Sequence, residues 1–290
     1  MKLETSELLK KVRKIEIRTR NLSQQIFAGQ YHSAFKGRGM AFSEVRAYTY
    51  GDDIRSIDWN VTARFHQPYV KVFEEEREQT VMLVIDTSAS TLFGTHQMFK
   101  QDLITELAAV ISFSAINNND KVGVLFYNDK IEKFIPPKKG KSHILRIISE
   151  LVNLKPQNGR TDTSLALQFL TNAIKKRCVL FLISDFIDTD FEKALQIAGN
   201  KHDIAAVKIR DKGEMLLPDV GFMQIRDSES GKTQIINTSN KEIRQQHAQW
   251  WKNNERQLND IFKKTGTDVI PLYTDEDYIP KLKDFFKKRS

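Results

Sequence analysis

The sequence predicts an α/β fold, a doubly wound and mainly parallel sheet preceded by a small N-terminal helical and β-containing subdomain. From residue 79 onward, short apolar runs alternate with longer amphipathic stretches, which is the order of strands and helices in a parallel sheet. The run at residues 80–85 is almost entirely apolar and rich in β-branched side chains. Such a run is typical of a strand covered on both faces, so we expect helices on both sides of the sheet.

The other elements follow that first strand in a regular order. A helix is predicted at residues 97–115, where Leu103, Leu107 and Val110 recur at helical spacing. An Asn-Asp turn separates strands at 122–127 and 131–135, as in a hairpin. The remaining predicted helices span residues 142–154, 164–175, 191–199 and 241–264, followed by a basic terminal helix. The remaining predicted strands span residues 179–184, 204–209 and 269–272, with an additional hairpin at 221–227 and 233–236.

Residues 1–78 form a predicted N-terminal unit, and residues 79–290 form the α/β domain. Apolar side chains near the start fall on one helical stripe, interrupted by Thr19: Leu8, Val12, Ile15, Leu22 and Ile26. We favour a helix packed on the α/β domain over a basic helix that docks on a partner or membrane surface. Strands are expected through Tyr48 and through residues 69–73, in a small β-containing subdomain that packs on the α/β domain.

The segment from Gly51 to Trp59 is rich in carboxylates and could be mistaken for a second metal site or a catalytic carboxylate pair. Three arginines, Arg46, Arg55 and Arg64, lie nearby in the sequence. We therefore expect an ion-paired joint between the N-terminal subdomain and the α/β domain.

The composition is that of a folded protein of 290 residues, 40% hydrophobic and 28% charged. The one cysteine, Cys178, lies in an apolar run and is expected to be an inert core thiol. No apolar segment resembles a signal peptide or reaches the roughly 18 residues of a membrane span, which predicts a cytosolic protein. The net charge of +8 is scattered over several clusters, which favours solvated basic faces over a nucleic-acid site.

Polar side chains gather where three predicted strands or loops reach one edge of the sheet. Asp86, Ser88 and Ser90 directly follow the most apolar strand, Thr161 lies in the loop before a helix, and Asp185 follows the strand at 179–184. In an open parallel sheet, sites form outside the carboxyl ends of the strands. Two carboxylates and three hydroxyls, with no sulfur or imidazole, are the ligands that hard cations such as Mg²⁺ prefer.

Helix capping is the competing interpretation of these residues, because Asp, Ser and Thr commonly begin helices. Thr161 or Asp162 could cap the following helix, and Asp188 with Asp190 is more typical of a capping cluster than of a metal site. We favour a metal site for Asp86, Ser88 and Ser90 because alternate residues of an extended turn point to one side.

The same residues carry a family resemblance. Asp86-x-Ser88-x-Ser90, with Thr161 and Asp185 downstream, is similar to the metal-ion-dependent adhesion site of von Willebrand A domains and integrin inserted domains. The stretch from Gly37 to Glu78, which includes Phe42-Ser43-Glu44 and Gly51-Asp52-Asp53, resembles a bacterial family known as domain of unknown function 58. Its members are often encoded beside MoxR-type AAA+ ATPases.

The resemblance implies a von Willebrand A or Rossmann-like fold and a distinct role for each ligand. Ser88 and Ser90 would bind Mg²⁺, or Mn²⁺ or Ca²⁺, directly. Thr161 would bind it directly or through water, and Asp86 and Asp185 largely through water. An Asp or Glu of another protein would complete the shell.

We therefore predict a metal-dependent protein-binding module and not an enzyme. The resemblance implies a MoxR-type AAA+ ATPase as partner, in chaperone-like assembly or maturation of other proteins. The alternatives are a metal-dependent phosphohydrolase on a related fold and a nucleic-acid binder. The sequence has no phosphate-binding Gly-rich loop and no Gly-x-Ser-x-Gly motif, and Ser88 stands where a haloacid-dehalogenase-like phosphatase has a second aspartate.

Overall fold

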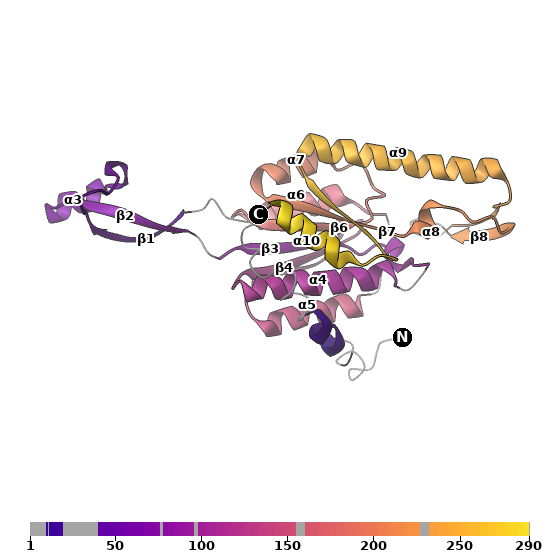
Figure 1. Ribbon diagram of the computed structural model, residues 1–290, viewed down its shortest axis with the longest axis horizontal. Coiled ribbons are helices and arrows are strands. Elements are labelled where there is room, and N and C mark those ends of the chain that lie inside the picture. The colour runs from indigo at the N-terminus through magenta and orange to yellow at the C-terminus, as the bar shows by residue number, and fades with distance from the viewer. Residues whose placement is uncertain are drawn as a thin grey trace.

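The computed structural model in Figure 1 describes residues 10, 12–19, 40–75, 78–95, 98–154, 160–226 and 232–289. Its centre is a six-stranded sheet with the order β10-β7-β6-β3-β4-β5. The strands are β3 (Thr80–Asp86), β4 (Lys121–Tyr127), β5 (Ile131–Lys138), β6 (Val179–Ser184), β7 (Asp203–Arg210) and β10 (Asp268–Tyr273). All neighbouring pairs are parallel except the pair of β4 with the edge strand β5. The predicted doubly wound, mainly parallel sheet is confirmed.

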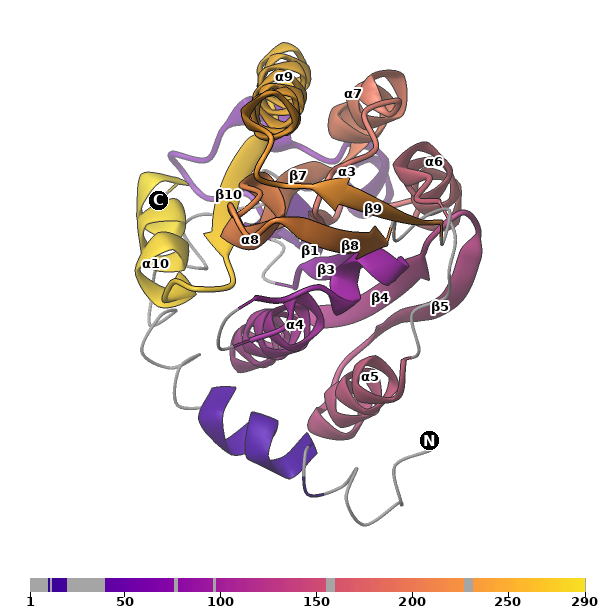
Figure 2. The ribbon, with the colours of Figure 1, turned by 90° about the vertical axis from the view of Figure 1, so that its right-hand side faces the viewer.

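Successive side chains of β3 enter two separate hydrophobic cores. Val81, Leu83 and Ile85 share one core with α4 (Lys100–Asn117), α5 (Lys141–Asn153) and α10 (Tyr278–Arg289). Met82 and Val84 share the other with α6 (Thr163–Ala173), α7 (Glu192–Lys201) and α9 (Lys241–Thr265). Figure 2 shows the two groups of helices on opposite sides of the sheet. Because both faces are covered, every position of this strand except the first is buried.

The predicted elements of the α/β domain are present, with bounds that differ by a few residues. The added hairpin consists of β8 (Phe222–Arg226) and β9 (Thr233–Asn237). Short elements were not predicted: η1 (Ile54–Ser56), α3 (Trp59–Phe65), η2 (Ala89–Leu92) and α8 (Lys212–Met215). Such short elements have too few residues to show a helical hydrophobic period.

Residues 12–19 form a helix that packs beside α4 and α5 (Figure 2). Val12 is buried in the core, and Arg18 pairs with Glu106 of α4 at 3.0 Å. Lys141 of α5 pairs with Glu16. These contacts agree with the favoured interpretation of a helix packed on the α/β domain. Leu8, Leu22 and Ile26 of the predicted stripe lie outside the described residues.

The N-terminal β unit is an arm that stands away from the α/β body (Figure 1). In it, β1 (Met40–Ala47) pairs antiparallel with β2 (Tyr69–Glu75), and α3 lies beside them. The arm is at the opposite end of the molecule from α8 and β8. The expectation that this unit packs on the α/β domain is therefore wrong. We retain residues 1–78 and 79–290 as a proposed division of the chain.

Charged side chains of the arm form ion pairs with one another. The Arg46 guanidinium donates to both carboxylate oxygens of Asp52 at 2.7 Å, and Lys71 lies 3.5 Å from Asp58. Asp53 and Asp58 accept backbone N–H groups at the starts of η1 and α3. The expected joint of ion pairs between arm and body is wrong, because these carboxylates instead bind side chains and backbone N–H groups within the arm.

The core thiol agrees with the prediction. Cys178 is buried, and its Sγ lies 3.2 Å from Nδ1 of His202. Burial raises the pKa of this thiol to about 12, so the reactive thiolate is scarce at neutral pH.

Candidate functional site

The site begins at the carboxyl end of β3. Asp86 ends the strand and is 1% exposed. Its Oδ1 accepts the backbone N–H of Ser88 at 2.9 Å, and its Oδ2 accepts the Ser184 hydroxyl at 2.7 Å. The first bond turns the chain after the strand, and the second ties β3 to the end of β6. Asp86 is thus held at the junction of two neighbouring strands.

Ser88 and Ser90 meet as predicted, but through the short helix η2 that starts after Ser88 and not through an extended turn. The Ser88 and Ser90 hydroxyl oxygens are 2.8 Å apart, and both side chains are buried. Thr87, between Asp86 and Ser88, points elsewhere and donates its hydroxyl to the Tyr127 carbonyl at 2.8 Å. Asp86, Ser88 and Ser90 are therefore gathered together, and Thr87 fastens the turn to β4.

Asp185 follows β6 and lies beside this cluster. The Ser90 side chain is among the groups that lower the pKa of Asp185, which places that carboxylate next to Asp86, Ser88 and Ser90. Asp185 is 4% exposed. The structure brings these four predicted residues together at one edge of the sheet.

Thr161, the fifth predicted residue, lies half-buried on the loop before α6. This loop is fastened beside the β4–β5 turn, because the Asp162 N–H donates to the Asn128 carbonyl at 2.8 Å. The Asp162 side chain accepts the Leu165 N–H at 2.8 Å and caps α6. Asp188 accepts the Thr163 and Asp190 N–H groups, as expected of a capping residue.

The two carboxylates of the site respond differently to burial. Burial, together with the nearby negative charge of Asp185, raises the pKa of Asp86 to about 7. Burial also acts to raise the pKa of Asp185, but the positive charges of Lys100 and Arg210 outweigh it and hold that pKa below its ordinary value. Asp185 is therefore charged, while Asp86 has less compensation from the chain.

A buried lysine adjoins the site and was not predicted. Lys100 begins α4, is 1% exposed, and places its Nζ 3.1 Å from Oδ2 of Asp185 and 2.6 Å from Glu214 of α8. Burial acts to lower the pKa of Lys100, but Asp185 and Glu214 outweigh it and raise that pKa above its ordinary value. The Lys100 ammonium is thus the counter-ion of Asp185, one of the predicted metal ligands.

Two further charged groups, Arg210 and Glu214, lie close enough to interact with Asp185. Arg210 ends β7 and is buried, with its guanidinium carbon 4.6 Å from the centre of the Trp251 ring. Glu214 follows four residues later in the sequence. A signal for both existed, because β7 also ends at this edge of the sheet and is followed by charged residues. Lys100 had no comparable signal, since it begins a helix and does not directly follow a predicted strand.

The donor set fits a hard cation, but Lys100 already pairs with one of the donors. Within the described residues, no group of three or more His, Cys, Asp or Glu side chains is placed to hold a metal ion. The candidate cluster instead has two carboxylates, and its other donors are hydroxyls. Oxygen ligands that include two buried carboxyl groups suit Mg²⁺. Lys100 already pairs with the charged Asp185, which bears on how tightly a metal would bind.

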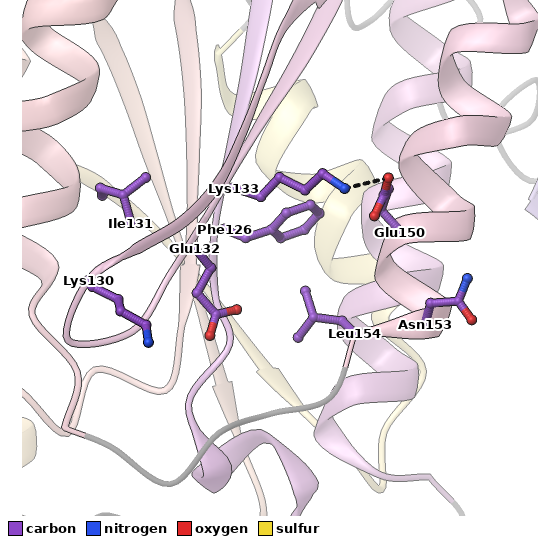
Figure 3. A pocket seen from close by; sticks show the side chains of 8 residues that line it. All are labelled: Phe126, Lys130, Ile131, Glu132, Lys133, Glu150, Asn153 and Leu154. Atoms are coloured by element: carbon purple, nitrogen blue, oxygen red, sulfur yellow. Dashed lines mark ion pairs between the residues drawn. The ribbon is translucent and has the colours of Figure 1, made fainter. Parts of the chain in front are cut away.

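Two pockets of the described residues lie outside this cluster. Figure 3 shows one of about 400 Å³ beside the edge strand β5, crossed by the ion pair of Lys133 and Glu150 at 2.6 Å. Its Glu132 accepts the Thr87 hydroxyl at 3.1 Å, so the pocket adjoins the back of the site turn. The second pocket lies between α6, α7 and α9. Neither is lined by the five predicted site residues.

Solved structures share this fold. An aerotolerance-related membrane protein from Bacteroides fragilis matches with a TM-score of 0.52 and 15% identity, covering 73% of this chain and 98% of that one. The conserved hypothetical protein BatB from Bacteroides thetaiotaomicron matches with a TM-score of 0.50 and 14% identity, with the same coverage. At these identities the likeness concerns the fold alone.

The prediction of a cytosolic protein is wrong by this comparison. A structure that shares the fold is described as that of a membrane protein, so the features that indicated a cytosolic location do not distinguish the two. In the parts of the chain that the structure describes, no helix is long and apolar enough to cross a membrane.

Curated relatives match over all or part of the chain. An uncharacterized protein of Mycobacterium tuberculosis, Rv1480, is 28% identical over 291 residues, covering 99% of this chain and 91% of the relative. An uncharacterized protein of Mycobacterium avium is 25% identical over 135 residues, covering 46% of this chain and 79% of the relative. The model of the family described as protein of unknown function DUF58 matches residues 44–257. With its six-stranded, mainly parallel sheet, this chain belongs to the DUF58 family.

Proposed function

We propose that this chain is a metal-dependent protein-binding module and not an enzyme. Asp86, Ser88, Ser90, Thr161 and Asp185 would hold Mg²⁺, with Mn²⁺ or Ca²⁺ as alternatives. The observation that carries the proposal is the buried cluster at the ends of β3 and β6. In it the Asp86 carboxylate accepts the Ser88 backbone N–H, and the Ser88 and Ser90 hydroxyls lie 2.8 Å apart beside Asp185. Burying two like charges together is unfavourable unless a cation compensates them.

The chemistry of this cluster favours an acidic partner. A bound divalent cation would supply the positive charge that lets a partner's Asp or Glu approach Asp86 and Asp185. Ser88 and Ser90 are neutral donors, so they leave most of that charge available to a ligand from outside. This arrangement suits a bridge between two proteins better than a buried structural ion.

The surface beside the cluster is suited to a protein partner. Leu92 and Phe93, two and three residues after Ser90, are 49% and 38% exposed, and Phe99 is 54% exposed. The backbone N–H of Lys100 donates to the Phe93 carbonyl at 3.0 Å, which keeps these apolar residues on one short loop. Exposed apolar side chains next to a polar centre are common in protein interfaces. We propose a MoxR-type AAA+ ATPase as the partner, on the family resemblance, with a role in assembly or maturation of other proteins.

Calorimetric titration with Mg²⁺ and Mn²⁺ tests the metal site. Wild type should bind, and Asp86→Ala should not, because the variant removes the carboxylate that orients the turn. Asp129→Ala is the control, since Asp129 is an exposed carboxylate in the β4–β5 turn. Equal binding by wild type and Asp86→Ala would exclude this site.

Capture of the MoxR-type ATPase tests the partner. The tagged chain should retain the ATPase in Mg²⁺ and lose it in EDTA. Capture that is the same in both buffers would show that recognition does not use the metal.

The phosphohydrolase alternative is not favoured by the geometry. Both carboxylate oxygens of Asp86 accept hydrogen bonds, from Ser88 N–H and the Ser184 hydroxyl, which suits an orienting ligand more than a nucleophile. We expect no turnover of a generic phosphate ester with Mg²⁺. Reproducible turnover that disappears in Asp86→Asn would instead support the enzyme.

A further inference from the structure

A cation from the chain occupies the position next to a predicted metal ligand. The Lys100 Nζ is 3.1 Å from Oδ2 of Asp185, and both side chains are almost fully buried. Two cations that share one carboxylate repel each other, and the repulsion is strong where water does not screen it. A metal at Asp185 and the Lys100 ammonium are therefore in competition.

The same ammonium has a second and nearer partner. Glu214 lies 2.6 Å from Nζ. Its position is fixed from outside the site, because the Asp211 carboxylate caps α8 at the Gly213 N–H (2.7 Å) and also accepts the Thr274 hydroxyl (2.6 Å). Glu214 can therefore retain the ammonium when Asp185 turns to another cation.

We propose that Lys100 is an internal competitor for the divalent cation at Asp185, and that Glu214 sets how strongly it competes. The proposal rests on the metal site proposed above, and it assigns to Lys100 and Glu214 the control of metal affinity. In the structure, the lysine pairs with both carboxylates, which corresponds to the low-affinity state. Metal binding requires the ammonium to leave Asp185 for Glu214.

The two partners of Lys100 predict effects of opposite sign. In Lys100→Met/Glu214→Gln, the competitor is gone and a neutral pair of similar size remains, so Asp185 is available to the metal. Mg²⁺ affinity should rise roughly tenfold or more. In Glu214→Gln alone, the ammonium depends on Asp185, and affinity should fall severalfold. General damage to the fold would weaken binding in both variants.

Calorimetry with Mg²⁺ and electron paramagnetic resonance of Mn²⁺ measure these affinities in the full chain. Lys212→Met is the matched control. Lys212 lies in α8, as Glu214 does, but it pairs with Asp275 and Glu276 on the surface. Its affinity should stay within about twofold of wild type, since exposed charges are screened. Thermal melts with and without Mg²⁺ give a second readout, in which the double variant should gain more from Mg²⁺ than wild type.

Several outcomes separate this inference from the metal site itself. If Asp86→Ala abolishes binding but the double variant binds no more tightly than wild type, Lys100 is not a competitor and the metal site stands. If the double variant binds Mg²⁺ and wild type does not, the competition is complete and the inference is supported. If no form of the chain binds either ion, both proposals fail.

Discussion

The Lys100 ammonium joins Asp185 and Glu214, at 3.1 and 2.6 Å, in the interior at one end of the sheet. These three residues come from the start of α4, the end of β6 and the short helix α8. Asp185 therefore serves two roles, as a predicted ligand for a metal and as the counter-ion of a buried lysine. The first prediction follows from the second role.

Lys100→Met should destabilise the protein by about 3–5 kcal/mol, because it leaves two buried carboxylates without their cation. Lys100→Met/Glu214→Gln should lose much less, since the pair becomes neutral. The free energies of unfolding come from urea titrations in EDTA, with Lys212→Met as the surface control. A single variant as stable as the double variant would show that the carboxylates do not need Lys100.

Ser88→Ala should separate partner binding from folding. The variant removes one neutral donor from the cluster but no apolar contact, so far-UV circular dichroism should match wild type. Capture of an acidic partner peptide or of the ATPase in Mg²⁺ should weaken at least severalfold. Ser142→Ala, at an exposed position of α5, should bind as wild type does. Undiminished capture by Ser88→Ala would place recognition elsewhere, and the residue 12–19 helix would be tested next.

Removal of the metal should lower the melting temperature only slightly. The two cores that flank β3 are apolar and complete without an ion, and their burial contributes roughly 25 cal/mol per Å². A weak ligand adds only its mass-action contribution, about 2.7 kcal/mol even at one hundred times its dissociation constant. Melts in EDTA and in Mg²⁺ measure the difference. Loss of cooperative unfolding in EDTA would make the ion structural, contrary to the prediction.

His202 should make stability depend on pH between about 6.5 and 4. Burial, with the nearby charges of Lys201 and Arg177, lowers the pKa of His202 from 6.5 to about 4. In that window the unfolded chain binds a proton that the folded chain does not, so stability is lost as pH falls from 6.5 toward 4. The loss should be about 1–3 kcal/mol.

His202→Gln should flatten this part of the stability curve. Denaturant titrations at several pH values measure the slope, whatever the variant does to stability at pH 7. His66→Gln, at an exposed position of the arm, is the control. An unchanged slope in His202→Gln would assign the loss to other groups.

Much of the α/β domain was predictable because its signals are local. In β3, residues 81–85 are apolar and buried on both faces, and that pattern is present in five consecutive letters of the sequence. Asp86, Ser88 and Ser90 follow the strand directly, so their meeting required only the geometry of one turn. Asp185 could be predicted for the same reason, because it directly follows another apolar strand.

The tertiary structure alone decided which charges meet inside the molecule. Lys100 and Glu214 are 114 residues apart, and nothing in the neighbourhood of Lys100 distinguishes it from a solvated lysine. The arm shows the converse: its charged segment suggested a joint with the body, but Arg46 finds Asp52 six residues away. Hydrophobic periodicity is a property of neighbouring residues, so the sequence determined the strands, the helices and the oxygen donors of the site. Ion pairing depends on which ends of the fold meet, and only the packed structure specifies that.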